Sequence, residues 1–389
     1  MNSEVQCDVL VVGGGIHGVG VAQAAAAAGY SVKLCEQTTL AAGTSSKSSK
    51  LIHGGLRYLE QAQFKLVRES IHERELLLRI APSLVQRHWF HIPVYPQTKR
   101  SGWWLRAGLS VYAVLGGLRR DTCYSSVPKA QWGNLDGLRT DGLQAVFRYS
   151  DAKTDDRLLT EAVMRSAESC GAELLCPVRV TRIQIDDDGC TSELDDSGMA
   201  VTCRSAVVVN AAGPWANRVI DLVQPEVRPC PVDLVQGTHI ELPGEITQGS
   251  YYLESPQDGR AVFVMPWYGR TLVGTTEHVF EGDPGSVRPL DQEIEYLLAV
   301  TRHYFPERAT ELLDAWAGLR VLPAAQGAAF SRSRETQLPV DHPRRPRFIS
   351  IFGGKLTGYR ITAGKVMERL AATLPPRTRQ ARTEEMMLE

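Results

Sequence analysis

The sequence lacks the patterns that mark secreted, metal-binding and membrane-spanning proteins. Its eight cysteines form no CxxC pair and no cluster with histidine, so they indicate reduced thiols in a cytosolic protein instead of disulfides or metal ligands. The N-terminus has no cationic segment of the kind that begins a signal peptide, and no apolar run is long enough to cross a bilayer. The acidic stretch at 186–189 lacks the spacing of a calcium loop and predicts a hairpin turn. No metal site is therefore expected, and the net charge of −1 gives nucleic-acid binding no support.

The first forty residues have the pattern of a nucleotide-binding βαβ unit. A β-branched run at 9–12 leads directly into a glycine turn, and the alanine-rich segment 19–28 predicts a helix that ends at Gly29. A second apolar run, 32–35, leads to Glu36. Strand, glycine turn, helix, strand and acid follow one another in the order that a Rossmann unit requires.

Each residue of this signature has a physical role. Gly13 permits a tight turn, Gly15 lets the backbone approach a pyrophosphate, and Gly18 brings helix and strand close together. The free N–H groups at the start of the helix attract phosphate. Glu36 can accept a hydrogen bond from a ribose hydroxyl, and its charge would repel a 2′-phosphate. The unit predicts a dinucleotide site without deciding between FAD and NAD.

Two distant segments favour FAD. Each is a buried-type strand that runs into small residues and then a helix start, one at 206–216 and the other at 348–357. A second glycine turn near the C-terminus is not expected in an NAD enzyme. The alternative interpretation is two core strands that are each followed by a tight turn. Both segments resemble motifs of the glutathione-reductase-like flavoproteins of the D-amino-acid-oxidase type. In those proteins the last helix points its positive end at the flavin ring and stabilises the charge of the reduced form.

The stretch 44–60 carries the most specific resemblance. Residues 48–59 read Ser-Ser-Lys-Leu-Ile-His-Gly-Gly-Leu-Arg-Tyr-Leu, and with the glycine turn they resemble FAD-dependent glycerol-3-phosphate dehydrogenases. The likeness covers residues 7–370. Three features depart from the family: His17 replaces a common asparagine, Glu277 replaces an aspartate, and the sequence ends where members commonly continue into a C-terminal helical domain.

The resemblance implies FAD as the cofactor and assigns a set of contacts to it. The implied cofactor-binding residues are Gly13, Gly15, Ile16, His17, Gly18, Glu36, Gln37, Thr44, Ser45, Ser48, Ser49, Leu51, His53, Gly54, Gly55, Val180, Ala211, Ala212, Gly213, Trp215, Gly353, Gly354, Lys355, Leu356 and Thr357.

The implied substrate is sn-glycerol 3-phosphate, which the family oxidises to dihydroxyacetone phosphate by hydride transfer to FAD. A phosphomonoester carries about two negative charges, and the planar guanidinium of arginine suits it better than lysine. The resemblance assigns this contact to Arg57, Arg320 and Arg334, with Arg332 as the alternative to Arg334. Tyr58 is the implied hydroxyl donor.

The oxidation also needs a group that removes the hydroxyl proton. His239 is the first candidate, because the ordinary pKa of histidine lies near the working pH. Lys355, at the second glycine turn, is the alternative, and Thr275 is expected to orient the hydroxyl. The predicted catalytic set is therefore His239, Lys355 and Arg320, and Thr275 joins them in contacting the substrate.

Two other classes of function stay open. A related FAD-dependent oxidase of an amino acid or a 2-hydroxy acid would need one arginine for a carboxylate, not a cluster of them. A non-catalytic flavoprotein subunit would bind FAD without turning over a substrate. Glycerol-3-phosphate oxidation in glycerol metabolism is the leading hypothesis.

The fold class expected is α/β, a Rossmann-like FAD-binding domain with an interleaved α+β substrate domain. Residues 1–60, 150–222 and 318–375 are assigned to the FAD-binding domain, and 61–149 and 223–317 to the substrate domain. Asp155 or Asp156 should cap one helix and Asp291 another. The charged residues 376–389 are expected to form a disordered tail.

The segment 102–118 bears on electron transfer. Tryptophans at one end and basic flanks suit a helix that lies in the headgroup region of a membrane, and a buried helix is the alternative. The family commonly passes electrons to quinone, so quinone or another acceptor is the expected partner. The expected location is cytoplasmic, with contact at the inner face of the cell membrane and a homodimer as open alternatives.

Overall fold

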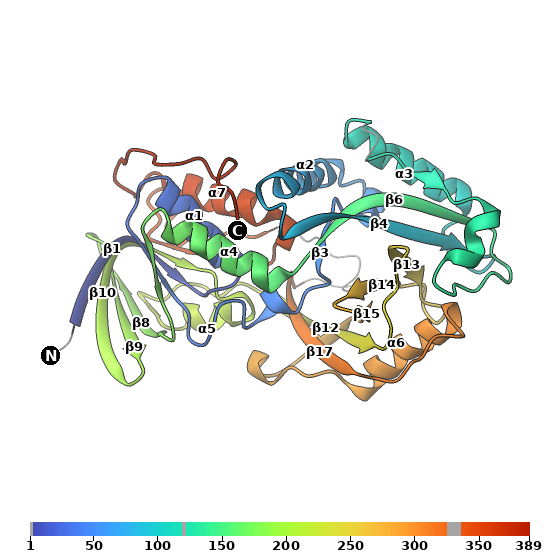
Figure 1. Cartoon of the computed structure of the whole chain (residues 1–389). Helices are drawn as coiled ribbons and strands as arrows, with labels where there is room; N and C mark the ends of the chain where they lie inside the picture. Colours follow the sequence, from blue (N-terminus) through green and yellow to red (C-terminus); the bar gives the residue numbers. More distant parts are fainter. Residues whose placement is uncertain (1–2, 119–121, 325–335) are drawn as a thin grey trace.

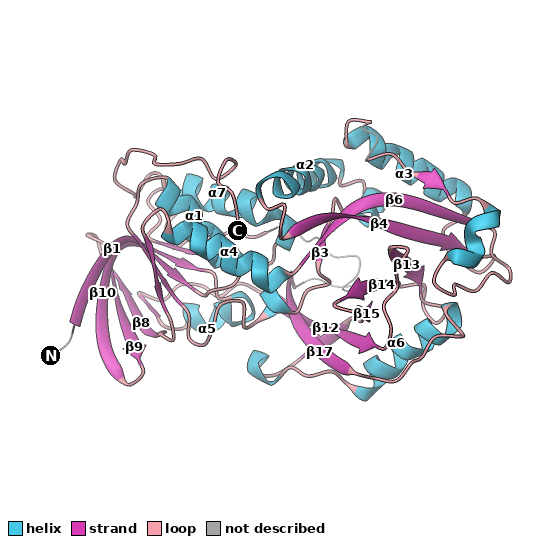
Figure 2. Cartoon of the chain, viewed as in Figure 1, coloured by secondary structure: helices cyan, strands magenta, loops and turns pink. Residues whose placement is uncertain are grey.

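Two β-sheets, one toward each end of the molecule, organise the chain in the computed structural model, which describes residues 3–118, 122–324 and 336–389 (Figure 1). The first sheet has eight strands in the order β11-β8-β9-β10-β1-β2-β7, with β18 beside β10. The second has ten in the order β16-β12-β15-β14-β13-β4-β6-β3, with β17 beside β12 and β5 beside β6. Helices cover both sheets (Figure 2). The observed class is α/β, as predicted.

The first sheet is mainly parallel, and its strands come from three separate segments of the chain, 3–35, 172–224 and 348–350. Its strands are β1 (Ser3–Val12), β2 (Val32–Cys35), β7 (Ala172–Leu175), β8 (Arg179–Ile185), β9 (Cys190–Asp196), β10 (Met199–Asn210), β11 (Val223–Gln224) and β18 (Phe348–Ser350). The helices around it are α1 (Ile16–Ala27), α4 (Asp156–Glu168), α5 (Ala216–Ile220) and α7 (Tyr359–Leu370). Helices α4 and α7 flank α1 on one face of the sheet (Figure 1).

The apolar run in β1 explains why the sheet is buried on both faces. Val9 and Val11 belong to the core beneath α1, α4 and α7, whereas Leu10 and Val12 belong to a second core on the opposite face. Side chains alternate across a strand, so a strand covered on both sides must be apolar throughout. Gly29, with φ +93°, follows the last turn of α1, as predicted.

The second sheet is mainly antiparallel. Its strands are β3 (Leu51–Ile52), β4 (Val85–Val94), β5 (Ser125–Ser126), β6 (Ala145–Thr154), β12 (Val232–Leu242), β13 (Ser250–Glu254), β14 (Ala261–Trp267), β15 (Arg270–Gly274), β16 (His278–Phe280) and β17 (Asp314–Pro323). Helices α2 (Phe64–Ile80) and α3 (Gly102–Leu115) pack on the side of β4 and β6, and α6 (Asp291–Tyr304) packs near β12 and β15 (Figure 1).

The strands cross several of the predicted domain boundaries. The whole of β6 lies in the second sheet, although residues after 150 were assigned to the FAD-binding domain. The same holds for β3 and for the part of β17 after residue 318. The two-part division stays a prediction, although β3, β6 and β17 all belong to the second sheet.

Two helix starts and one turn were predicted from aspartates. The side chain of Asp155 accepts hydrogen bonds from the backbone N–H groups of Arg157 and Leu158 and so caps α4, as predicted. The hairpin turn at 186–189 is also confirmed, between β8 and β9. The cap at Asp291 is wrong, because Leu290 holds that position and Asp291 is the first residue inside α6.

The C-terminal segment 376–389 is ordered against the first sheet, its helices and the end of α2, and the expectation of a disordered tail is not met. Arg377 forms an ion pair with Asp8 at 2.8 Å. The backbone N–H of Leu388 donates to the carbonyl of Ile80, and its side chain is buried. Arg377 and Glu384 of the tail pair with charged residues outside it, and composition alone does not show this.

Helix α3 packs on one face only. Leu105, Leu109 and Tyr112 are buried, whereas the side chains of Trp103 and Trp104 are 69% and 60% exposed. The two tryptophan rings stack on each other with centroids 5.2 Å apart. One face of α3 is thus buried in the core of the second sheet and the other is exposed, and membrane contact stays a prediction. In the described part of the chain, no helix combines the length and the apolar character needed to span a bilayer.

Candidate functional site

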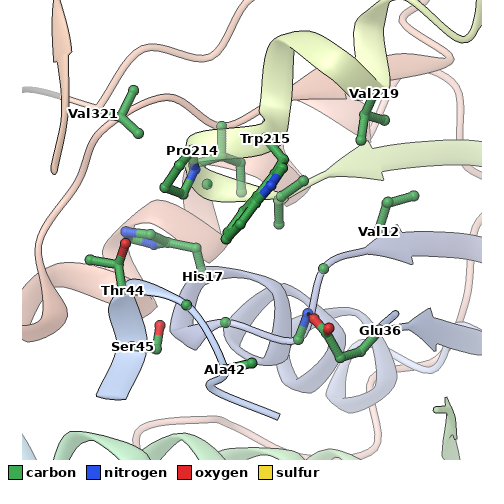
Figure 3. A pocket seen from close by; sticks show the side chains of 18 of the residues that line it. Val12, His17, Glu36, Ala42, Thr44, Ser45, Pro214, Trp215, Val219 and Val321 are labelled. Carbon is green, nitrogen blue, oxygen red and sulfur yellow. Dashed lines mark hydrogen bonds between the residues drawn. The ribbon is translucent and has the colours of Figure 1, made fainter. Parts of the chain in front are cut away.

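A cavity of about 980 Å³ lies between the glycine turn after β1 and strand β17 of the second sheet. Its walls come from the ends of β1, β2, β10 and β18, from the start of α1 and from residues 319–322. Figure 3 shows His17, Thr44 and Ser45 on one side of the cavity and Pro214 and Trp215 across from them. The cavity therefore joins the three segments in which the sequence predicted the nucleotide site.

The glycine turn is as tight as its predicted role requires. Gly13 has φ +110°, and a Cβ atom there would lie 2.7 Å from the carbonyl oxygen of Ala211. A Cβ at Gly18 would lie 1.9 Å from the carbonyl oxygen of Gly13, closer than any real contact. Glycine is thus needed at both positions for helix α1 to approach β1 and β10. The N-terminus of α1 opens at the cavity, and its first turn carries no acidic residue.

Glu36 lies at the end of β2 and braces the glycine turn. One carboxylate oxygen accepts from the backbone N–H of Gly14 at 2.8 Å. The other accepts from the backbone N–H and the hydroxyl of Thr38, at 2.9 and 3.0 Å. Glu36 also lines the cavity, so the carboxylate is held at the place where a ribose hydroxyl can reach it.

His17 connects the first glycine turn with the second. Burial lowers the pKa of His17 from its ordinary value to about 4, so the ring is neutral near pH 7. A Cβ at Gly354 would lie 2.3 Å from the Nε2 of His17, so this imidazole requires glycine at 354. Within the described residues, Nδ1 of His17 is buried without a hydrogen-bond partner. A buried polar atom beside a cavity indicates that a bound group completes its contacts.

Most of the predicted cofactor residues line this single cavity. They are Gly13, Gly15, Ile16, His17, Glu36, Gln37, Thr44, Ser45, Ser48, Val180, Ala211, Ala212, Gly213, Trp215, Gly353, Gly354, Lys355 and Leu356. The predicted residues outside its lining are Gly18, Ser49, Leu51, His53, Gly54, Gly55 and Thr357.

Several residues outside the lining still support it. The backbone N–H of His53 donates to the hydroxyl of Thr357 at 3.1 Å, which ties the 48–59 motif to the second glycine turn. The N–H of Gly54 donates to Asp151 and to the hydroxyl of Tyr112. These bonds fix the backbone of the motif, so the proposed role of Gly54 and Thr357 is indirect.

Lys50 holds the serine-rich part of the motif in place and was missed by the sequence analysis. Its ammonium group donates to the carboxylate of Asp156 at 2.6 Å and to the carbonyl of Ser46 at 2.7 Å, and both charged side chains are buried. The second oxygen of Asp156 accepts from the N–H of Ser48. A lysine inside a serine-rich stretch was the only signal for this role, because its partner lies 106 residues away.

Ser49 does not line the cofactor cavity but contacts His239, the candidate base. Its hydroxyl lies 3.0 Å from Nε2 of His239, and the His239 ring stacks on Trp316 with centroids 5.7 Å apart. A Cβ at Gly274 would lie 2.1 Å from this ring, so glycine makes room for the histidine. Burial, together with the positive charges of Lys50 and Arg320, lowers the pKa of His239 to about 3.

Arg320 is held at the edge of the cavity by the loop after β15. Its guanidinium donates to the carbonyl of Thr276 at 2.7 Å and to the carboxylate of Glu277 at 3.0 Å. Thr275 lies close by, since a Cβ at Gly237 would touch both its hydroxyl and the guanidinium at 2.5 Å. The structure thus brings together Arg320 and Thr275, two residues that were predicted to contact the substrate.

The remaining substrate candidates divide into described and undescribed groups. The ammonium of Lys355 lies over the ring of Tyr58, 3.6 Å from its centroid, and Lys355 lines the cavity. The backbone of Arg57 lies in the 3₁₀ segment Leu56–Gln61, and its side chain is not described. Arg332 and Arg334 lie outside the described residues.

The residues present fit FAD. A dinucleotide suits three features of the cavity: the two glycine turns, the open N-terminus of α1, and Glu36 with its fixed carboxylate. Among the described residues, Nδ1 of His17 has no hydrogen-bond partner, and it lies where a bound group can reach it. The chemistry that FAD supplies when bound is acceptance of a hydride.

Comparison with known proteins agrees with this fit. Residues 8–364 match the family model described as FAD dependent oxidoreductase, and the chain belongs to this family. It is 38% identical over 378 residues to a glycerol-3-phosphate dehydrogenase of Pseudomonas aeruginosa, an alignment that covers 93% of this chain and 71% of the relative. It is 36% identical over 388 residues to a D-erythritol 1-phosphate dehydrogenase of Brucella abortus, covering 95% of this chain and 74% of the relative.

A solved structure is also similar. The glycerol-3-phosphate dehydrogenase of Bacillus halodurans, complexed with FAD, superposes with a TM-score of 0.77 and 26% identity. The match covers 98% of this chain and 68% of that one. The protein is therefore an FAD-dependent oxidoreductase, and FAD is its cofactor.

We expect the purified protein to carry FAD without a covalent link. His17 is the one histidine that lines the described cavity, and its neutral, buried ring suits a contact with the cofactor. Acid precipitation should leave the yellow colour in the supernatant. Flavin that stays with the pellet would contradict this expectation, and the loss of that retention in His17→Asn would identify the link.

Proposed function

We propose that this protein oxidises sn-glycerol 3-phosphate to dihydroxyacetone phosphate with FAD. The observation that carries the proposal is the position of Arg320, a guanidinium at the rim of the cavity whose orientation is fixed by Thr276 and Glu277. A fixed guanidinium is the group best suited to a phosphomonoester dianion. The names of the relatives support this substrate class, because two of them act on polyol phosphates.

The residues around Arg320 supply the other steps. Arg320 binds the phosphate, and Arg57 and Tyr58 are further candidates on the 48–59 motif. Thr275, beside Arg320, orients the hydroxyl that is oxidised. Neutral His239 accepts the hydroxyl proton while the hydride leaves carbon, so that the secondary alcohol becomes a ketone. Lys355 stabilises the negative charge that develops on the oxygen.

Anaerobic mixing tests the proposal. Glycerol 3-phosphate should bleach the flavin absorbance, and glycerol at the same concentration should do so poorly. D-erythritol 1-phosphate is the second substrate to test, because it shares the phosphate and is the substrate named for one relative. Bleaching by an amino acid or a 2-hydroxy acid, and not by either phosphate, would overturn the proposal. No bleaching by any of them would favour a non-catalytic flavoprotein.

The proposed electron acceptor is a quinone reached from the surface of a membrane. The side chains of Trp103, Trp104 and Val114 are exposed on α3, and Arg106 on the same helix has its guanidinium over the ring of Phe147. Exposed tryptophans with neighbouring basic residues favour the interface between water and lipid. This proposal includes a cytoplasmic location with contact at the inner face of the membrane. It also includes a homodimer.

Liposome flotation tests the membrane contact. We expect the wild-type protein to float with liposomes that contain anionic lipid, and the Trp103→Ser/Trp104→Ser variant to stay at the bottom of the gradient. Because both side chains are exposed, the substitutions should leave FAD content and thermal stability unchanged. A matched control is Tyr268→Ser, which removes an exposed aromatic side chain far from α3 in sequence. Equal, negligible flotation of all three proteins would favour a soluble acceptor.

A further inference from the structure

Glu293, on helix α6, has an unusual concentration of hydrogen bonds. One carboxylate oxygen accepts from the hydroxyl of Thr276 at 2.5 Å. The other accepts from the hydroxyl of Thr238 at 2.7 Å and from the side-chain amide of Gln236. The same oxygen accepts from the backbone N–H of Leu290 at 3.2 Å. The side chain is 7% exposed, so this carboxylate is nearly enclosed by the donors it serves.

Two of these donors, Gln236 and Thr238, lie on the face of β12 that is turned away from Arg320. Side chains alternate along a strand, so Gln236 and Thr238 point toward α6. Gly237, between them, faces the opposite way, and a Cβ there would touch the guanidinium of Arg320 at 2.5 Å. Glu293 and Arg320 therefore act from opposite sides of one strand.

Thr276 connects the two sides. Its hydroxyl donates to Glu293 and accepts from the N–H of Thr238 at 2.8 Å. Its backbone carbonyl accepts from the guanidinium of Arg320 at 2.7 Å. The next residue, Glu277, supplies the carboxylate that holds the same guanidinium. A shift of Thr276 would move both acceptors that orient Arg320.

We propose that Glu293 is a positioning residue for the phosphate-binding arginine. It fixes Thr276, and Thr276 fixes the direction in which Arg320 presents its guanidinium at the cavity. This inference deepens the proposed function and depends on it for the role of Arg320. Its effect should appear in the binding of the phosphate group and not in the binding of FAD.

The test measures binding of dihydroxyacetone phosphate to the FAD-loaded protein by calorimetry, so that no turnover is needed. Glu293→Gln should weaken this binding roughly tenfold, within the range of coupling energies between neighbouring residues. Its FAD content should be unchanged. The matched control is Glu295→Gln, on the same helix, whose carboxylate is exposed and paired with Arg302. The control should bind as the wild type does.

A double-mutant cycle separates positioning from general destabilisation. If Glu293 acts through Arg320, Glu293→Gln should weaken binding less than about twofold in an Arg320→Ala background. The same tenfold loss in both backgrounds would overturn the proposal, and so would an unchanged affinity in the single variant. Should Glu293→Gln fail to fold, Thr276→Val and Thr276→Ser replace it. The first removes the hydroxyl link and should weaken binding, and the second keeps the link and should restore it.

Failure of the proposed function would look different. Glycerol 3-phosphate would then not bleach the flavin, while the coupling between Glu293 and Arg320 in binding the phosphate would persist. If the wild type binds dihydroxyacetone phosphate no better than dihydroxyacetone, Arg320 is not a phosphate contact and the inference on Glu293 falls.

Discussion

Replacing Arg320 by alanine should raise the apparent dissociation constant for glycerol 3-phosphate about ten- to a hundredfold. The loss of one charge-assisted contact to a phosphate costs about 1.5–3 kcal/mol, which corresponds to this range. Arg320→Lys should fall between the wild type and alanine, because lysine keeps the charge but loses the planar fork. Rapid mixing at a series of substrate concentrations gives the apparent affinity from the rate of flavin reduction.

Two controls keep this result interpretable. Arg320 is paired with Glu277, whose side chain is 4% exposed, so the alanine variant leaves a buried carboxylate with fewer partners. Arg320→Ala/Glu277→Gln removes that charge and should show the same weak substrate binding. Arg302→Ala, an exposed arginine on α6 paired with Glu295, should change nothing. An unchanged affinity in Arg320→Ala would exclude this residue as the phosphate contact.

The sequence predicts the nucleotide-binding half of the fold because its signals are local. The run 9–12, the glycine turn and the acid at Glu36 lie within a few residues of each other, and each has a defined backbone or hydrogen-bonding consequence. The cap at Asp155 is local as well. The two later strands carry enough apolar residues to be recognised; β10 pairs with β1, and β18 pairs with β10, all in parallel.

The substrate half depends on pairings that no local pattern encodes. Strand β17 lies along β12, which places Trp316 against His239 and brings Arg320 to the loop of Thr276 and Glu277. Resemblance to a family selected Arg320 and His239, whereas their supports, Lys50 and Glu293, were not selected. Both supports act through side chains far away in the sequence, so their residue type alone does not reveal them.

Replacing His239 by alanine should slow flavin reduction about 10²–10⁴-fold, the usual contribution of a general base, while FAD stays bound. His239 does not line the cofactor cavity, so its loss should spare the cofactor. Its hydrogen bond to Ser49 and its stacking on Trp316 fix the ring. Ser49→Ala should therefore cause a smaller loss, because the ring keeps its stacking partner.

The acid limb of the pH profile provides an independent check on His239. Burial, Lys50 and Arg320 lower its pKa to about 3, so the free enzyme holds a neutral imidazole throughout the usual assay range. The neutral form is the one that accepts a proton, and activity that depends on it is lost only as pH falls through this lowered pKa. A bound phosphate dianion beside Arg320 offsets the cation that lowers the pKa. The loss should therefore begin at a higher pH in the substrate complex than in the free enzyme.

Lys355 is the competing candidate for the base. It lines the cavity, and its ammonium lies over the ring of Tyr58, 3.6 Å from the ring centroid. A charged ammonium can stabilise a developing alkoxide but has no free electron pair with which to take a proton. We therefore expect Lys355→Met to cause a smaller loss of the reduction rate than His239→Ala. Rapid-mixing measurement of both variants isolates the chemical step from reoxidation. A large loss in Lys355→Met and a modest one in His239→Ala would transfer the role of base to Lys355.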